Sequence, residues 1–271
     1  MPEISAALLF ATGAATGLVG ALLGLGGGVF LVPLLTLGFG VPIRAAIAAS
    51  LISVIATASA SATVNLNRGL VNMRLGLVLE VATSVGGLLG GLAASRLTQR
   101  QLFVTFAATL AVMGVLMALR SGRRNVIADL AVDPGLLGGR LREGDTTFVY
   151  RVRRLPVAMS SSLVAGALSG LLGLGGGIIK VPVLNTFCGI PIRVAAATST
   201  FMIGVTAAAS AFLYFSRGDV ALDLTAAVCL GALPGSLLGA HLSDRVQARV
   251  LKIIMAVVLV VVAARMALEG M

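Results

Sequence analysis

Charged residues are scarce in this chain: they make up 11% of its 271 residues, whereas hydrophobic residues make up 58%. A soluble domain averages about a quarter charged residues. The low charge content and the mean hydropathy of +1.06 exclude an ordinary soluble protein and indicate an integral membrane protein. Each spanning helix needs about 20 apolar residues, so spanning segments alone account for most of the length.

The residues of metal and acid-base chemistry are nearly absent as well. The chain has one histidine, His241, and two cysteines, Cys188 and Cys229, with neither CxxC nor HExxH spacing. Metal sites need several ligands at defined spacing, so the sequence predicts no metal and no cofactor. It also lacks clustered acids and a Ser-His-Asp set, which argues against an enzyme. We expect His241 at a membrane interface and both cysteines to act as small core residues.

Acidic residues are half as frequent as basic ones, ten against 20, which gives a formal net charge of +10. Most of the basic excess lies between apolar segments or at their edges. This distribution is typical of membrane topology and not of nucleic-acid binding. The expected partners are the lipid bilayer and a small anionic substrate. The N-terminal stretch starts with an acid and lacks a basic region, so we interpret it as the first membrane segment.

The chain contains an internal repeat. Residues 16–119 align with 165–268 without a gap, and about forty of the 104 pairs are identical. This divides the chain into an N-terminal transmembrane repeat (1–120), a basic linker (121–155) and a C-terminal transmembrane repeat (156–271). The interval 120–156 holds eight arginines, which places the linker on the cytoplasmic side. Its β-prone stretch TTFVYRV predicts a small hairpin near 146–153.

Each half has five apolar segments, which in the first half are 4–24, 28–38, 44–66, 73–95 and 101–120. The second segment is too short to span a membrane and directly follows glycines. A continuous helix through the first two would be ~50 Å long, against a ~30 Å bilayer core. The expected fold is therefore an all-α polytopic membrane protein, each half with a glycine-broken re-entrant hairpin and three spanning helices.

The basic residues favour inverted repeats. If each hairpin returns to its own side, and Lys180 is left out of the counts as intramembrane, fourteen basic residues share one side of the membrane and five the other. A single broken helix that crosses the membrane would give parallel repeats and a split of twelve against seven. The inverted arrangement follows the positive-inside rule better.

The hairpins are broken at a duplicated glycine cluster, LLGLGGGVFLVP at 22–33 and LLGLGGGIIKVP at 171–182. Neither copy has the spacing of a P-loop or of a dinucleotide loop. Irregular backbone at membrane depth is tolerated where it is buried in protein or lines a cavity. The N–H groups of a helix start suit an anion, so both clusters are expected to form one site near the midplane. The predicted residues are Gly26, Gly27, Gly28, Gly175, Gly176 and Gly177. The alternative is close helix packing, which we expect for GGLLGG at 86–91 and GSLLGA at 235–240.

Further polar residues are candidates for the same site. A hydroxyl stripe at helical spacing recurs in both halves, as Ser50, Thr57 and Ser61 and as Ser199, Thr206 and Ser210. Lys180, whose counterpart is Leu31, is expected to bind the anion, and the alternative is that it reaches an interface. Glu80, whose counterpart is Cys229, is a candidate for proton coupling or a structurally paired acid. Arg44 and Arg193 are candidates for attracting anions to the entrances, or topology anchors.

The segments GLVGALLGLGGGVFLVPLLTLGFGVPIRAAIAAS and GALSGLLGLGGGIIKVPVLNTFCGIPIRVAAATST resemble the two signature segments of the TauE/SafE family of sulfite and organosulfonate exporters. The resemblance covers nearly the whole chain. It implies a multi-pass carrier of the cytoplasmic membrane that exports small sulfur-containing anions such as sulfite, taurine or sulfoacetate. Matching broken helices in two halves are typical of alternating access. The alternative is an anion channel or facilitator for small carboxylates or inorganic anions.

Overall fold

A computed structural model of the chain describes residues 5–23, 26–119, 133–143, 146–242 and 263–266. The first half forms α1 (Ala6–Leu23), α2 (Gly28–Pro33), the π-helical turn η1 (Leu34–Gly38), α3 (Ile43–Asn67), α4 (Met73–Ala94) and α5 (Gln99–Leu119). The second half forms α6 (Leu155–Leu172), α7 (Gly177–Thr186), α8 (Ile192–Ser216) and α9 (Leu222–Leu242). The predicted apolar segments are confirmed to within a few residues. The fifth segment of the second half falls largely outside the described residues.

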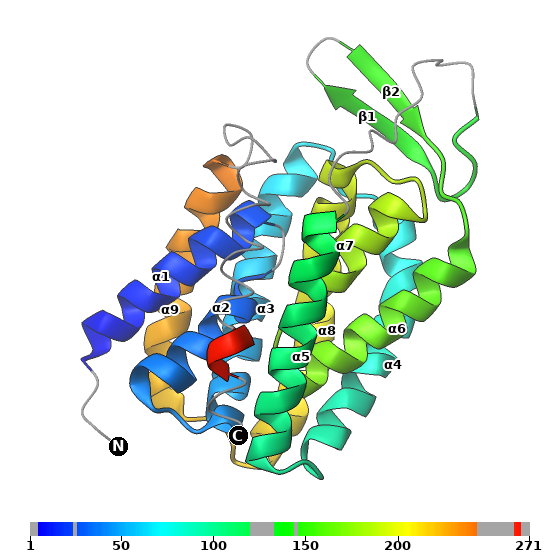
Figure 1. The fold of residues 1–271 in the computed structure, drawn as a ribbon. Helices are drawn as coiled ribbons and strands as arrows, with labels where there is room; N and C mark the ends of the chain where they lie inside the picture. The colour runs from blue at the N-terminus through cyan, green and yellow to red at the C-terminus, as the bar shows by residue number, and fades with distance from the viewer. Residues whose placement is uncertain (1–4, 24–25, 120–132, 144–145, 243–262, 267–271) are drawn as a thin grey trace.

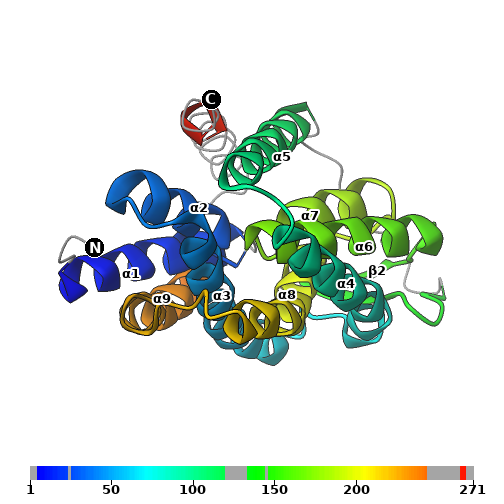
Figure 2. The same ribbon diagram turned by 90° about the horizontal axis from the view of Figure 1, so that it is seen from below.

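Two long helices, α3 and α8, pack together at the centre of the molecule. The pair α1 and α9 flanks them on one side, and the pair α4 and α6 on the other (Figure 2). Each flanking pair joins the first segment of one half to the fourth segment of the other. In Figure 1, α1 and α9 rise side by side, whereas α4 and α6 descend. The inverted orientation of the repeats across a membrane stays a prediction.

Glycines let the flanking helices approach to backbone contact. A Cβ atom added to Gly86 or Gly90 of α4 would collide with a carbonyl oxygen of α6. A Cβ added to Gly235 or Gly239 of α9 would likewise collide with a carbonyl oxygen of α1. Small residues at such spacing allow close helix packing in membranes. The packing role predicted for GGLLGG and GSLLGA is therefore confirmed.

Two arginines, 149 residues apart in the chain, make equivalent hydrogen bonds between the halves. Arg68 Nη1 donates to the carbonyl oxygen of Ala240 over 3.0 Å. Arg217 Nη1 donates to that of Gly91 over 2.8 Å. Because each acceptor lies in the last turn of its helix or close to it, a cation there complements the helix dipole. These contacts join the end of each central helix to the opposite half.

A two-stranded antiparallel sheet lies in the linker, with β1 (Gly139–Glu143) paired to β2 (Thr146–Tyr150). The sequence predicts a hairpin near 146–153. Strand β2 falls in that range. Its partner strand lies earlier in the chain, because TTFVY pairs with residues 139–143. The hairpin lies at the top of the molecule in Figure 1, beyond the ends of the helices.

Asn72 connects the linker to the helices. Its Oδ1 caps α4 by accepting from Leu75 N over 3.0 Å. Its Nδ2 donates to the carbonyl oxygen of Leu137 over 2.7 Å and to the Tyr150 hydroxyl over 3.0 Å. Burial raises the pKa of Tyr150, and the hydrogen bond with Asn72 opposes that shift. Tyr150 therefore stays neutral near pH 7 and remains a stable partner for the amide.

Replacing Asn72 with alanine should destabilise the protein by about 1–2 kcal/mol, because a helix cap is lost and the Leu137 carbonyl loses its donor. That loss corresponds to a fall of a few degrees in Tm, measurable by thermal unfolding in detergent. Asn67→Ala is the matched control, since Asn67 is exposed at the end of α3. An equal fall in Tm for both variants would contradict the role assigned to Asn72.

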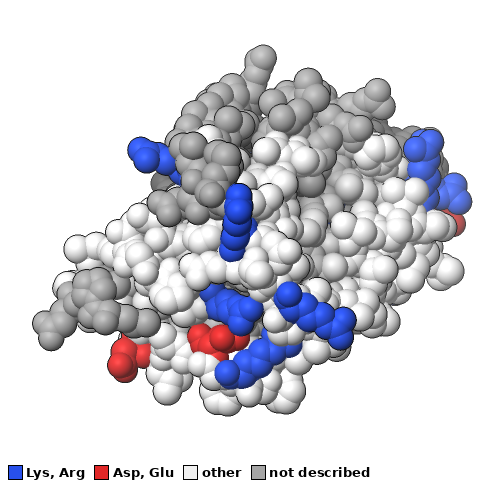
Figure 3. All heavy atoms as spheres, turned by 60° about the horizontal axis from the view of Figure 1, so that its bottom comes forward, with Lys and Arg blue, Asp and Glu red and all other residues white. Residues whose placement is uncertain are grey.

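The outer surface of the helices is apolar. Six helices are long and apolar enough to cross a membrane, and large side chains such as Val81, Phe212 and Leu222 are more than two-thirds exposed. The face in Figure 3 is mostly uncharged, with small groups of basic and acidic side chains. Such a surface suits hydrocarbon and not water, so the chain is a multi-pass membrane protein.

Candidate functional site

The two glycine clusters interrupt the chain at corresponding places. α1 ends at Leu23 and α2 begins at Gly28, while α6 ends at Leu172 and α7 begins at Gly177. The glycines with a positive φ angle here are Gly26 (80°), Gly27 (77°), Gly173 (72°), Gly175 (74°) and Gly176 (71°). Glycine adopts this region without the steric penalty of a Cβ. The cluster therefore lets each helix end and a short one begin in a new direction.

The two breaks are in contact with each other. A Cβ added to Gly28 would collide with the carbonyl oxygen of Gly173. Ser50 Oγ, on α3, donates to the same carbonyl oxygen over 2.8 Å. The first helix break therefore lies against the second, as a single site built from both clusters requires.

The predicted hydroxyl stripe is buried in both halves, at Ser50, Thr57, Ser61, Ser199, Thr206 and Ser210. In the first half its hydroxyls hold the glycine loops, because Thr57 Oγ1 donates to the Gly26 carbonyl oxygen over 3.1 Å, besides the Ser50 bond. In the second half, Ser199 Oγ has no hydrogen-bond partner in the described part of the chain. The same residue types thus make different contacts in the two halves.

Glu80 is a buried acid between α4 and α8, with 7% of its surface exposed. Its Oε1 accepts hydrogen bonds from Thr206 Oγ1 of α8 over 2.8 Å and from Ser84 Oγ over 2.9 Å. Its Oε2 is buried without a partner among the residues described. Because only one oxygen is satisfied, the carboxyl group retains capacity for a proton or a cationic partner.

Lys180 lies in the first turns of α7 and is fully buried. Its Nζ has no hydrogen-bond partner within the described ranges. The ammonium group and the carboxyl of Glu80 interact electrostatically. A buried ammonium is costly unless it is paired and hydrogen-bonded. The three N–H donors of the Lys180 ammonium therefore favour the binding of an acceptor at this place. The alternative, that Lys180 reaches an interface, is wrong, since the side chain is fully buried.

The electrostatic interaction between Glu80 and Lys180 is the feature of the candidate site that the sequence does not predict. The two residues are 100 positions apart and belong to different halves. No helical or strand periodicity connects them. One sequence signal is common to both residues. Each is charged whereas its counterpart in the repeat alignment is not, because Glu80 aligns with Cys229 and Lys180 with Leu31.

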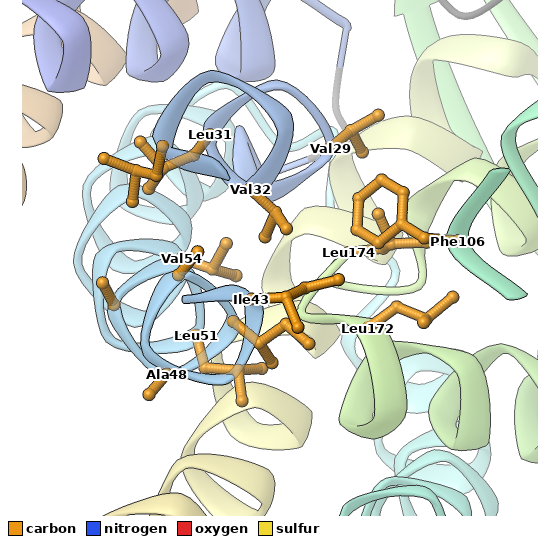
Figure 4. Close-up of a cluster of buried hydrophobic side chains, with 14 of the residues drawn as sticks. Val29, Leu31, Val32, Ile43, Ala48, Leu51, Val54, Phe106, Leu172 and Leu174 are labelled. Carbon is orange, nitrogen blue, oxygen red and sulfur yellow. The ribbon is translucent and has the colours of Figure 1, made fainter. Parts of the chain in front are cut away.

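The equivalent place in the first half is apolar. Leu31 is buried in an apolar cluster to which α2, α3, α5 and the segment after α6 contribute, and Figure 4 shows Val29, Val54, Phe106 and Leu174 as members of this cluster. No charged side chain of the described residues is buried there. The two glycine clusters therefore differ in electrostatics, although the matched pairs Gly26/Gly175 and Gly27/Gly176 have similar φ angles.

The remaining charged candidates lie at the surface. Arg44 and Arg193 are both exposed near the starts of α3 and α8. Arg44 Nη2 donates to the carbonyl oxygen of Leu97 over 2.9 Å, which ties α3 to the segment before α5. Asp223 occupies the first turn of α9, where an acid complements the helix dipole.

Metal binding has no candidate site in the described ranges, where no three His, Cys, Asp or Glu side chains are grouped to hold an ion. Cys188 is fully buried in a hydrophobic cluster, and Cys229 is partly buried. Burial raises the pKa of the Cys188 thiol, and the nearby positive charge of Arg154 opposes the shift. The thiol of Cys188 is thus a small core group.

Apolar helices of spanning length, helix breaks in contact at the centre and buried ionisable side chains are features of a multi-pass membrane transporter. The family model described as "Sulfite exporter TauE/SafE" matches residues 9–266. The chain belongs to this family of membrane transporters.

Several named proteins are similar to this chain. "Probable membrane transporter protein YunE" of Bacillus subtilis is 26% identical over 275 residues, which cover 99% of each chain. "Probable membrane transporter protein" of Xylella fastidiosa (strain 9a5c) is 28% identical over 239 residues, covering 86% of this chain and 84% of that protein. "Sulfite exporter TauE/SafE family protein 5" of Arabidopsis thaliana is 35% identical over 88 residues, 32% of this chain and 19% of its own length. No solved structure matches.

Proposed function

We propose that this protein exports small sulfur-containing anions across the cytoplasmic membrane by alternating access. The substrates are organosulfonates such as taurine or sulfoacetate, or sulfite. The family supports this chemistry, since its model is described as a sulfite exporter. The observation that carries the proposal is the fully buried Lys180 ammonium, which has no hydrogen-bond partner in the described part of the protein and lies next to a helix break.

The anion is proposed to bind at the start of α7. The first N–H groups of a helix have no partner within the helix, and the positive end of its dipole favours an anion. Lys180 adds a full charge one turn into the same helix, and Ser199 lies on α8, which packs against α7. A sulfonate has three oxygens, so it accepts from the ammonium, a hydroxyl and backbone N–H groups together.

The other candidate residues take supporting roles in this proposal. Ser50 and Thr57 hold the glycine loops through their hydrogen bonds to Gly173 and Gly26. Thr206 orients Glu80, the candidate for proton coupling. Arg44 and Arg193 raise the local anion concentration at the surface.

Uptake into proteoliposomes tests this function. The purified protein should give saturable flux of at least one labelled anion from a panel of sulfite, taurine, sulfoacetate, methanesulfonate and acetate. Empty liposomes are the control. Flux that rises linearly with concentration without saturating would favour the channel alternative, and no flux of any anion in the panel would overturn the proposal.

A further inference from the structure

Buried charge is confined to one helix bundle of the molecule. Glu80 and Lys180 are the two charged side chains buried in the described part of the chain. They belong to α4 and α7, which pack with α6 and α8. Their repeat counterparts Cys229 and Leu31 carry no charge. The polar centre of the protein is therefore asymmetric, although its backbone is built from two similar halves.

Unsatisfied polar atoms concentrate in the same four helices. Of the seven buried side-chain atoms without a hydrogen-bond partner in the described residues, five lie there: Lys180 Nζ, Glu80 Oε2 and the Oγ atoms of Ser162, Ser169 and Ser199. Buried polar groups in native structures nearly always have a partner, often a bound ion or water. Lys180 Nζ can only donate and the three hydroxyls can donate as well as accept, so an acceptor such as an anion fits this set.

The charges of this bundle limit what can bind. Its helices carry four charged side chains in the described residues, and two of them, Arg74 and Arg193, are exposed. α6 carries no charged residue, and α8 faces Glu80 with the hydroxyl of Thr206. Among the described residues of these helices, Lys180 is therefore the single charge that faces Glu80. With both groups ionised, the empty site is neutral.

An anion added to a neutral site leaves one uncompensated negative charge at membrane depth. Such a charge is costly to bury, and Lys180 cannot compensate both the anion and Glu80. A proton on Glu80 makes the loaded site neutral. The positive charge of the Lys180 ammonium then compensates the anion alone. Protonation also gives the carboxyl group an O–H donor, which can serve the Oε2 atom that has no partner among the described residues.

We infer that the site binds one singly charged anion at Lys180 together with one proton on Glu80, so that transport is electroneutral. This inference rests on the proposed function and narrows its substrates to singly charged anions such as hydrogensulfite, so the sulfoacetate dianion and zwitterionic taurine are expected to be poor substrates. The proton joins the carboxylate from water on the loading side and returns to water on the release side, and no other bond changes. Net export then requires an outward anion gradient larger than the inward proton gradient.

Flux measurements in proteoliposomes with imposed gradients test the inference. The probes are methanesulfonate, a monoanion, and sulfoacetate, a dianion. In the wild type, methanesulfonate uptake should be driven by an acidic exterior, should not respond to membrane potential and should exceed sulfoacetate uptake. Glu80→Gln has no carboxyl group to bind the proton. Its uptake should therefore be independent of the pH gradient and should move one net negative charge with each anion. Its equilibrium accumulation should then change about 50-fold for an imposed potential of about 100 mV, the factor for one elementary charge.

Ser84→Ala is the matched control, because it removes a hydrogen bond to Glu80 Oε1 without changing the charge. It should remain electroneutral. Wild-type flux that follows the membrane potential and ignores pH, or that prefers sulfoacetate, would overturn the inference while leaving the transport function standing. Electroneutral, pH-driven flux in Glu80→Gln would overturn it as well. If Glu80→Gln does not fold, the wild-type measurements decide alone, and absence of any anion flux contradicts the proposed function instead.

Discussion

Lys180→Met should lower the apparent affinity for the transported anion by roughly 10- to 100-fold. A hydrogen bond to a charged group contributes about 1.5–3 kcal/mol, and each 1.4 kcal/mol is a factor of ten. Methionine has a similar length and fits the enclosed space, and it removes a buried ammonium that has no hydrogen-bond partner among the described residues. Tm should fall, because the substitution leaves the buried Glu80 carboxylate without its counter-charge, and removing one partner of a buried charge pair is destabilising. Saturable uptake and thermal unfolding measure the two effects.

Leu31→Met is the matched control for this substitution. Leu31 is the repeat counterpart of Lys180 and is buried in an apolar cluster, where a volume-conserving change costs less than about 1.5 kcal/mol. It should retain the wild-type affinity. Equal affinity of Lys180→Met and the wild type would show that the ammonium does not bind the anion.

Gly176→Ala should have the second-largest effect, on folding and transport together. Gly176 has a φ angle of 71°, which costs a non-glycine residue about 1–2 kcal/mol. An added Cβ would also lie 2.9 Å from the Ala165 carbonyl oxygen, so the start of α7 must shift. A displacement of about 1 Å at a binding site can cost about 100-fold in rate. We expect Tm to fall by several degrees and flux to drop at least about tenfold.

Gly38→Ala separates this effect from a general loss of glycine. A Cβ at Gly38 meets nothing within 4 Å, and its φ angle is not positive. It should retain the wild-type Tm and flux. Gly27→Ala is expected to resemble Gly176→Ala, because its Cβ would lie 3.0 Å from the Thr16 carbonyl oxygen. Normal stability of Gly176→Ala would refute the strained conformation at the helix break.

The helical segments could be predicted because hydropathy and glycine placement are local signals. The break before Gly28 and the short helix after it follow from glycine conformation and bilayer thickness. The packing role of Gly86 and Gly90 also follows from spacing. Which helix each would meet could not be predicted, because the pairing of α4 with α6 depends on contacts between residues far apart in the sequence.

The individual residues of the candidate site could be predicted from the sequence, but the contacts between them could not. Helical spacing correctly places Ser50 and Thr57 on a buried stripe, but their hydrogen bonds to the glycine loops depend on tertiary structure. Lys180 and Glu80 attract attention separately as ionisable residues in apolar segments. Their interaction arises because α7 and α4 both border α8, which no sequence pattern encodes.

Counterflow in proteoliposomes tests the central claim, a carrier that binds its anion at Lys180, most directly. Vesicles are loaded with unlabelled methanesulfonate and diluted into a trace of the labelled anion. The wild type should accumulate label transiently above equilibrium, as an alternating-access carrier does, and Lys180→Met should not. Label that only equilibrates in the wild type, or equal accumulation in both proteins, would contradict the account.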